Sequence, residues 1–460
     1  MSQPEEYDVV VLGSGAPGKL LAWTLASQGR RTAVVERRYV GGSCPNIACL
    51  PSKNVIHGAK VADYFRRGAD FGIVHGDWKV DMSTVRERKR RMVDGLVEMH
   101  LAKYRESGAE LVMGQGRFVA PKTIEVALNA GGTRTLRGQT VIIDTGSRAR
   151  MDDTAGLAEA RPLTHVEALE LDQLPQHLLV LGGGYVGLEL AQAFRRFGSH
   201  VTVIERNSAP IHREDPDVID AIERLFQDEK IDVLTRTAVT RVEGRSGESV
   251  RLHTGRGLIE GTHLLLAGGR TPNTDGIGLA EAGVETDEKG HVKVDARLRT
   301  TAEGVWAAGD CAGSPNFTHI GEDDFRVVLA NLTGGDRVTT GRQVPFCLFT
   351  DPELARVGLS ERDARARGIG YRLAKVPMEA VFRARTVSET RGFLKALIEE
   401  DGDRILGFTA FGTGAGEVMA VVQVAMLARL PYTVLRDAIL THPTLAEGLA
   451  ALFSSLPQQK

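Results

Sequence analysis

The chain has 460 residues, 42% hydrophobic and 25% charged, a balance typical of a globular protein and enough chain for roughly three domains. Its formal net charge of −2 gives no electrostatic reason to expect binding to nucleic acid or to an anionic membrane. The polar N-terminus lacks a secretory core, no apolar run is long enough to span a bilayer, and four cysteines are too few for a disulfide scaffold. We therefore expect a cytoplasmic protein with no membrane or nucleic-acid partner.

The N-terminal segment predicts a dinucleotide-binding βαβ unit. The apolar run Tyr7–Leu12 predicts a buried strand, Leu20–Leu25 a helix, and Thr32–Val35 a second strand. A Gly-x-Gly-x-x-Gly turn joins the first strand to the helix through Gly13, Gly15 and Gly18. These glycines let backbone N–H groups approach a pyrophosphate at the helix N-terminus. Glu36 follows the second strand and would accept hydrogen bonds from a ribose.

Two cysteines, Cys44 and Cys49, follow this unit in the segment 41–53. At a helix start their spacing predicts thiols on adjacent turns, close enough for a disulfide. Beside a bound flavin, such a disulfide can take up an electron pair and pass it to a substrate. A stapling disulfide or a zinc half-site would use the same residues, but no matching second Cys or His pair is visible. We therefore favour the redox interpretation and predict no metal.

A basic run, Arg86–Arg91, follows in a predicted helix. It could indicate nucleic-acid binding, or a solvated helix face with apolar residues turned inward. We favour the second interpretation, because the net charge is near zero and no aromatic stacking set accompanies the run. The inward residues would be Val85, Met92, Val93 and Leu96.

A second dinucleotide-binding unit follows. His177–Leu181 and Val201–Ile204 are its predicted strands. The glycine turn between them contains Gly182, Gly184 and Gly187. Two such units predict two dinucleotides. Glu205 at the end of the second strand suits a free ribose 2′-hydroxyl and would repel a 2′-phosphate, which favours NADH. The adjacent Arg206 could still accommodate NADPH.

Together these motifs resemble those of the pyridine-nucleotide-dependent flavoprotein disulfide reductases, the family of lipoamide dehydrogenase, glutathione reductase and mercuric reductase. Three further segments resemble motifs of the same family, namely 141–146, 264–273 and 305–310. The resemblance implies an α/β fold with two Rossmann-like domains, for FAD and NAD(P), and a C-terminal α+β dimerisation domain. The FAD domain would comprise segments 1–150 and 271–340, around an NAD(P) domain at 151–270, with the dimerisation domain at 341–460.

In the dimerisation domain, Phe346–Glu353 and Gly392–Ile398 are predicted as strands of an antiparallel sheet, and Gly416–Arg429 as a helix. The resemblance implies that the chain works as a homodimer whose subunits share the active site. In that site, His442 would cross to the partner subunit as acid–base group, oriented by Glu447.

The resemblance also implies the other site residues. Cys44 would be the interchange thiol that meets substrate, and Cys49 would lie against the flavin as the charge-transfer thiolate. Lys53 would pair with Glu189 beside the flavin and the nicotinamide. Beyond the first glycine turn and Glu36, the expected FAD contacts are Gly42, Ser43, Thr145, Gly146, Asp310 and His319. Gly269 joins the expected NAD(P) contacts.

The substrate must be argued from differences within the family. Mercuric reductases carry a cysteine pair near the C-terminus, whereas residues 456–460 contain none. The segments 13–19, 314–319 and 447–453 resemble the reactive-chlorine-resistance and hypothiocyanous-acid reductases. We therefore expect an NAD(P)H-dependent, FAD-containing enzyme that passes electrons through Cys44–Cys49 to a small thiol-reactive oxidant or disulfide. Alternatives are dihydrolipoamide dehydrogenase, mercuric ion reductase, and a non-enzymatic redox sensor.

Overall fold

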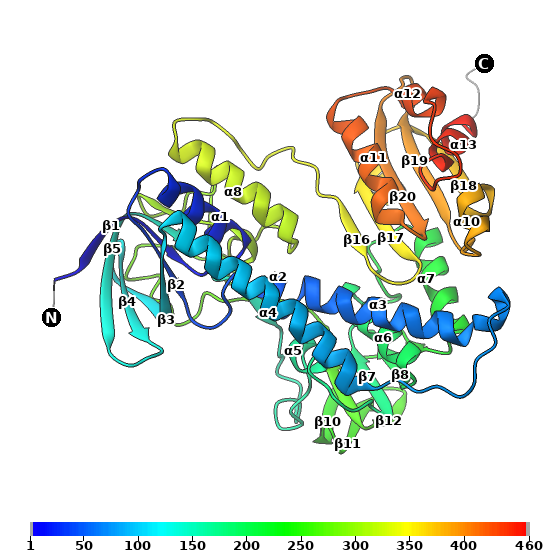
Figure 1. Ribbon diagram of the computed structural model, residues 1–460, viewed down its shortest axis with the longest axis horizontal. Helices are drawn as coiled ribbons and strands as arrows, with labels where there is room; N and C mark the ends of the chain where they lie inside the picture. Colours follow the sequence, from blue (N-terminus) through cyan, green and yellow to red (C-terminus); the bar gives the residue numbers. More distant parts are fainter. Residues whose placement is uncertain (1–2, 457–460) are drawn as a thin grey trace.

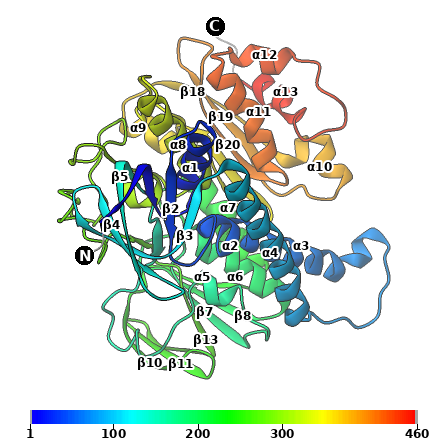
Figure 2. The same ribbon diagram turned by 60° about the vertical axis from the view of Figure 1, so that its left-hand side comes forward.

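The computed structural model describes residues 3–456. Residues 1–2 and 457–460 lie outside this range, and with them most of the C-terminal segment used to argue against mercury reduction. Three main sheets, each with its own helices, lie around helix α3 (Cys49–Arg66), which runs between helix α6 and the C-terminal sheet (Figures 1 and 2). We call the three units the first, second and third domains in chain order. Within residues 3–456, no helix combines the length and apolar character needed to cross a membrane.

The first sheet has a parallel core in the order β3-β2-β1-β5-β15, with β4 antiparallel to both β3 and β5. All five residues of β2 are buried, as expected for a strand covered on both faces. Strand β15 joins from far along the chain, so two separated segments build this sheet. The strands are β1 (Glu5–Leu12), β2 (Thr32–Glu36), β3 (Glu110–Ala120), β4 (Thr123–Leu128), β5 (Thr133–Ile143) and β15 (Val305–Ala307). The helices are α1 (Ala16–Ser27), α4 (Met82–Ser107) and α8 (Thr318–Leu332).

The second sheet is parallel in the order β13-β7-β8-β9, and a three-stranded antiparallel sheet, β10-β11-β12, accompanies it. A short antiparallel pair, β6 with β14, belongs to the two connections between the first and second sheets. The strands are β6 (Ser147–Ala149), β7 (His177–Leu181), β8 (His200–Ile204), β9 (Asp232–Leu234), β10 (Val239–Arg245), β11 (Ser249–Thr254), β12 (Gly257–Gly261), β13 (His263–Leu266) and β14 (Arg270–Pro272). The helices are α5 (His165–Ala168), α6 (Tyr185–Phe197) and α7 (Pro216–Asp228).

The C-terminal sheet is antiparallel in the order β16-β17-β20-β19-β18. Helices α11 and α13 contribute apolar residues to its core. The strands are β16 (Phe346–Leu348), β17 (Glu353–Gly358), β18 (Tyr371–Pro377), β19 (Phe393–Glu399) and β20 (Ile405–Gly412). The helices are α9 (Glu361–Ala366), α10 (Phe382–Thr386), α11 (Ala415–Leu427), α12 (Tyr432–Asp437) and α13 (Gly448–Ser454).

Two sequence predictions need correction in this domain. The segment Phe346–Glu353 is not one strand, because β16 ends at Leu348 and β17 begins at Glu353. Between them, the backbone N–H of Phe349 donates to Glu189 Oε1 at 2.9 Å, and that of Asp351 donates to Gln192 Oε1 at 2.8 Å. These N–H groups bind side chains of α6 instead of a neighbouring strand. The predicted helix 416–429 runs from Ala415 to Leu427, before Arg429 turns left-handed at a φ of 55°.

The basic run 86–91 is not simply a solvated helix face. Lys89 is buried and forms an ion pair with Glu170. Arg90 also pairs with Glu170, at 2.8 Å, and Arg86 pairs with Asp172 at 2.7 Å. Both acidic residues follow α5. The run therefore ties α4 of the first domain to the second domain.

A buried lysine joins the second and third domains. Lys395 on β19 is fully buried, and its Nζ donates to Asp215 at 2.8 Å, to Asp217 at 2.8 Å and to Glu361 at 3.2 Å. Within residues 3–456, these three carboxylates are the group whose spacing could hold a metal ion. In this structure the lysine ammonium provides the positive charge among them. Breaking such a buried ion cluster leaves uncompensated charge, so the contact fixes the two domains against each other.

Candidate functional site

A cavity of about 1980 Å³ lies between the first sheet, helix α6 of the second domain, and strand β16 of the third. It brings together most of the residues predicted for FAD and for catalysis. Those lining it are Gly13, Gly15, Glu36, Gly42, Ser43, Cys44, Cys49, Lys53, Thr145, Gly146, Glu189, Asp310 and His319. The remaining predicted residues do not line it, namely Gly18, Gly182, Gly184, Gly187, Glu205, Arg206, Gly269, His442 and Glu447.

The first glycine turn is shaped by Asp144. Gly13 has a φ of 103°, and a Cβ there would lie 2.0 Å from the Asp144 carbonyl oxygen. A Cβ on Gly15 would lie 2.6 Å from Asp144 Oδ2, which instead accepts a hydrogen bond from the Gly18 N–H at 2.8 Å. Gly18 thus serves helix packing and the contact with Asp144. Burial raises the pKa of Asp144 well above its usual range.

The two acidic residues that follow the Rossmann strands have matching environments. Glu36 Oε2 accepts hydrogen bonds from the N–H of Ser14 at 3.0 Å and from its hydroxyl at 2.7 Å. Glu205 Oε2 accepts from the Gly183 N–H at 2.8 Å, and its Oε1 from the Asn207 N–H at 2.7 Å. Each buried carboxylate therefore fixes the glycine turn of its own unit.

The cavity wall beside the first glycine turn contains residues suited to FAD. Asp310 accepts a hydrogen bond from Ser147 and lies 3.6 Å from Arg270. The buried hydroxyl of Thr145 has no hydrogen-bond partner within the described residues. An orphaned donor, a glycine turn without room for Cβ atoms, and two helix N-termini at α1 and α8 fit a bound dinucleotide. His319 donates from Nε2 to the Pro345 carbonyl oxygen at 2.8 Å.

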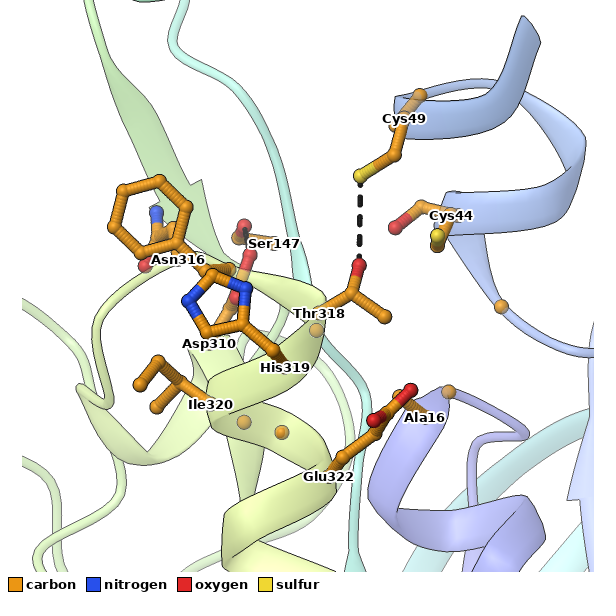
Figure 3. A pocket seen from close by; sticks show the side chains of 18 of the residues that line it. Ala16, Cys44, Cys49, Ser147, Asp310, Asn316, Thr318, His319, Ile320 and Glu322 are labelled. Carbon is orange, nitrogen blue, oxygen red and sulfur yellow. Dashed lines mark hydrogen bonds between the residues drawn. The ribbon is translucent and has the colours of Figure 1, made fainter. Parts of the chain in front are cut away.

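Cys44 and Cys49 lie on two helices, because the chain leaves helical geometry at Ile47 and Ala48. Cys44 is in α2 (Ser43–Asn46), Cys49 begins α3, and both thiols are free. Figure 3 shows the Cys49 side chain pointing toward the N-terminus of α8, where the Thr318 hydroxyl lies 3.4 Å from Cys49 Sγ.

The two thiols differ in acidity. A hydrogen bond from Cys44, together with Thr318 and the charge of Lys53, lowers the pKa of Cys49 to about 6 despite burial. The same hydrogen bond and burial raise the pKa of Cys44. The reduced pair therefore holds one thiolate, on Cys49, and one protonated thiol, on Cys44.

Lys53 and Glu189 form the ion pair that the family resemblance implied. Lys53 Nζ lies 2.7 Å from Glu189 Oε2, and the glutamate is buried. The ammonium also lies 4.7 Å from the centre of the Phe349 ring, within cation–π distance. Because Lys53 lies on α3 one turn after Cys49, this charge pair sits beside the thiolate.

His442 and Glu447 also form a pair, but outside the cavity. His442 Nδ1 lies 2.8 Å from Glu447 Oε2, and the histidine side chain is 66% exposed. Its ring packs edge-on against Phe382 at 5.8 Å. In a single chain, therefore, this imidazole is oriented by a carboxylate but does not face the cysteines.

Sequence reasoning missed several residues that line the cavity. Tyr185 stacks on Phe346 at 5.3 Å, next to Phe317, and Thr318 contacts Cys49. Lys19 hydrogen-bonds to the loop before Cys44. The available sequence signal was adjacency to predicted site residues, because Thr318 precedes His319 and Lys19 follows Gly18. Neither threonine nor lysine marks a redox site by itself.

This fold, with a dithiol in a dinucleotide-sized cavity, is that of a flavoprotein disulfide reductase. The chain matches the pyridine nucleotide-disulphide oxidoreductase family over residues 7–324 and the dimerisation domain of that family over residues 344–452. The chain therefore belongs to this family. It is an FAD-dependent NAD(P)H:disulfide oxidoreductase that acts on a sulfur group, and its dimerisation domain implies a homodimer.

Individual proteins support this assignment. The chain is 34% identical over 455 residues to the probable pyridine nucleotide-disulfide oxidoreductase RclA of Escherichia coli, covering 98% of this chain and 99% of that protein. It is 37% identical over 457 residues to a mercuric reductase of Streptomyces lividans, covering 96% and 94%. A solved structure, described as the HOCl-induced flavoprotein disulfide reductase RclA from Escherichia coli, matches with a TM-score of 0.90 and 34% identity over 97% of this chain and 99% of that one.

The acidity of Cys49 gives a testable prediction. In the reduced protein, the rate of Cys49 alkylation should rise with pH through a midpoint of about 6, because only the thiolate reacts. Cys44→Ala removes the hydrogen-bond donor and should move this midpoint upward, whereas Cys44→Ser retains a donor and should move it less. Site-resolved mass spectrometry after brief iodoacetamide treatment measures both. A midpoint near the free-cysteine value of about 8.5 in the unmodified protein would contradict the assignment.

Proposed function

We propose that the chain uses NADH to reduce a small thiol-reactive oxidant or disulfide, with Cys44 as the residue that attacks the acceptor. The observation that supports this most directly is that two free thiols share one dinucleotide-sized cavity with the Lys53–Glu189 ion pair, and the opposite directions of their pKa shifts agree with separate roles. A structural disulfide or a redox sensor needs neither the Lys53–Glu189 pair nor the oriented His442. FAD bound here would supply the two-electron relay between nicotinamide and dithiol.

The other roles in the reaction are cofactor binding, charge stabilisation and proton transfer, and each is assigned to residues of the chain. Glu36, Gly42, Ser43, Thr145, Gly146 and Asp310 would hold FAD, and His319 would lie at its flavin end. Lys53 and Glu189 would hold a fixed charge pair beside the flavin and Cys49. Because Cys44 keeps its proton, a base must remove that proton before Cys44 attacks. The partner subunit's His442, oriented by its own glutamate, would be that base.

We further infer that the enzyme prefers NADH. The contacts for this cofactor would be Gly182, Gly184, Gly187, Gly269 and Glu205, with Arg206 exposed beside them. The Glu205 carboxylate is buried at the end of β8, where a 2′-phosphate would meet a like charge. A preference for NADH also agrees with the cytoplasmic location that we infer. The domain limits at residues 150, 270 and 340 stay predictions.

The acceptor is proposed from the relatives. The RclA structure is described as HOCl-induced, which favours a small oxidant of the reactive-chlorine type over a protein substrate. Dihydrolipoamide dehydrogenase is the second candidate, because the chain is also 30% identical over 456 residues to the mitochondrial dihydrolipoyl dehydrogenase of Pisum sativum.

An anaerobic NADH-consumption assay separates these candidates. The purified protein should turn over hypothiocyanous acid faster than oxidised lipoamide or Hg²⁺. Cys44→Ser should lose acceptor turnover at least about a hundredfold, because the nucleophile is gone, while NADH still reduces the flavin. Faster turnover of lipoamide would instead identify a dihydrolipoamide dehydrogenase. Retained acceptor turnover in Cys44→Ser would overturn the assigned role of Cys44.

Mixed dimers test whether the site is shared. Cys44→Ser and His442→Ala homodimers should each be nearly inactive. A heterodimer of the two variants should regain about half the activity of the unmodified dimer, because one of its two sites combines an intact dithiol with an intact histidine from the other subunit. If each site used the histidine of its own chain, both sites would be defective, and the heterodimer would stay inactive.

The cofactor preference is tested by Glu205→Gln. This change keeps a hydrogen-bonding side chain near Gly183 but removes the negative charge, so the ratio of kcat/KM for NADPH to that for NADH should rise about tenfold, equivalent to ~1.4 kcal/mol. Glu260→Gln, on an exposed position of β12 in the same domain, is the matched control. An unchanged ratio in Glu205→Gln would show that Glu205 does not set the preference.

A further inference from the structure

The cavity contains a second lysine, Lys19, on the first turn of α1. It is half-buried, and its Nζ donates to the Gly41 carbonyl oxygen at 3.1 Å. Gly41 lies three residues before Cys44, so this bond ties the ammonium to the loop that carries the interchange thiol. Lys19 thus has a position next to Cys44 that parallels the position of Lys53 next to Cys49.

The second partner of Lys19 is a histidine that must accept a hydrogen bond. His100 is buried, and its Nδ1 lies 2.5 Å from the Leu96 carbonyl oxygen, which can only accept. Nδ1 therefore bears the proton, and the lone pair of Nε2 faces Lys19 Nζ at 2.8 Å. Burial, together with the Lys19 charge, lowers the pKa of His100 and keeps it neutral.

Lys19 differs from Lys53 in lacking a close counter-ion. Within residues 3–456, no ion pair joins Lys19 to a carboxylate, whereas Lys53 lies 2.7 Å from Glu189. The titratable groups that act on Lys19 from a greater distance are Cys44, Asp144 and Glu322. Burial raises the pKa of Asp144, and Glu322 lies on α8 (Figure 3), but among residues 3–456 neither carboxyl group forms an ion pair with Lys19.

A desolvated ammonium with only neutral hydrogen-bond partners is costly unless an anion joins it. Burial accordingly lowers the pKa of Lys19, and the nearby Cys44 opposes that shift. Two of the three N–H bonds of Lys19 have the acceptors given above, and the residue lines the cavity that holds Cys44.

We propose that Lys19 is a specificity-determining residue that binds negatively charged acceptors beside Cys44. This inference rests on the proposed function and names the substrate class of the same site, which is small anionic disulfides and oxidants. In each turnover with a disulfide, the Cys44 thiolate attacks one acceptor sulfur, the acceptor S–S bond breaks, and the first thiolate leaves with its electron pair. The Cys49 thiolate then attacks Cys44, forms the Cys44–Cys49 disulfide and releases the second thiolate. Lys19 attracts the acceptor and stabilises the departing negative charge.

Two aromatic disulfides, one anionic and one neutral, test this proposal. 5,5′-Dithiobis(2-nitrobenzoate) is an anion, and 4,4′-dithiodipyridine is neutral at neutral pH. In the FAD-loaded homodimer, Lys19→Met should lower kcat/KM for the anionic disulfide about tenfold relative to the neutral one, the effect expected for loss of one charge-assisted hydrogen bond. Lys19→Arg should restore most of this ratio. Lys103→Met, at an exposed position on α4, is the matched control and should leave the ratio unchanged.

A second readout does not depend on turnover. In the reduced protein, Lys19→Met should lower the alkylation rate of Cys44 by the anion iodoacetate relative to the neutral iodoacetamide. An equal effect on both members of each pair would overturn the proposal. Loss of bound FAD with an unchanged charge ratio would also overturn it, and would make Lys19 a counter-ion of the FAD pyrophosphate. If the unmodified protein turned over hypothiocyanous acid but neither aromatic disulfide, this inference would fail while the proposed function stood. If it turned over none of these acceptors with NADH, the proposed function would fail as well.

Discussion

The unequal acidity of Cys44 and Cys49 is the feature on which the rest of the site depends. Two thiols in the same environment would titrate together and give no ordered chemistry. Here a hydrogen bond from Cys44 stabilises the Cys49 thiolate, and Thr318 and Lys53 add to that stabilisation. Each of these three groups comes from a different place, namely α2, the start of α8, and the second turn of α3.

Such a site requires the three domains to be held rigidly, and buried ion pairs provide that constraint. Lys395 binds carboxylates of the second domain from within the third. Arg196 on α6 pairs with Asp351 at 2.6 Å, and Lys60 on α3 pairs with the same aspartate at 2.8 Å. Asp351 belongs to the connection between β16 and β17, so one carboxylate links all three domains. This connection also carries Phe349, whose N–H orients Glu189.

Much of this arrangement could be predicted from local sequence patterns. The two glycine turns, with their acidic residues Glu36 and Glu205, predicted two Rossmann units because those patterns reflect backbone constraints within one unit. The Cys44–Cys49 spacing and the pairing of Lys53 with Glu189 were also accessible, the latter through family resemblance. The fold and the reaction class are confirmed by the family match. The roles assigned to individual residues stay predictions.

Features that depend on contacts between distant segments could not be predicted. The strand 346–353 was predicted as continuous because its residues suit a sheet, but side chains of α6 bind its N–H groups. Lys89 was assigned to solvent because helical periodicity does not reveal Glu170. The role inferred for Lys19 depends on the tautomer of His100, which only the contact with Leu96 determines.

The central claim, that NADH delivers electrons to Cys44 and Cys49, is tested most directly by mapping thiols during a single reduction. The oxidised homodimer would be mixed anaerobically with one equivalent of NADH per subunit, quenched with iodoacetamide and analysed by mass spectrometry. Before mixing, we expect a Cys44–Cys49 disulfide, and afterwards alkylation of both cysteines, with Cys311 and Cys347 unchanged. The claim would be contradicted if NADH reduced the flavin, another acceptor then reoxidised it, and the Cys44–Cys49 disulfide persisted throughout.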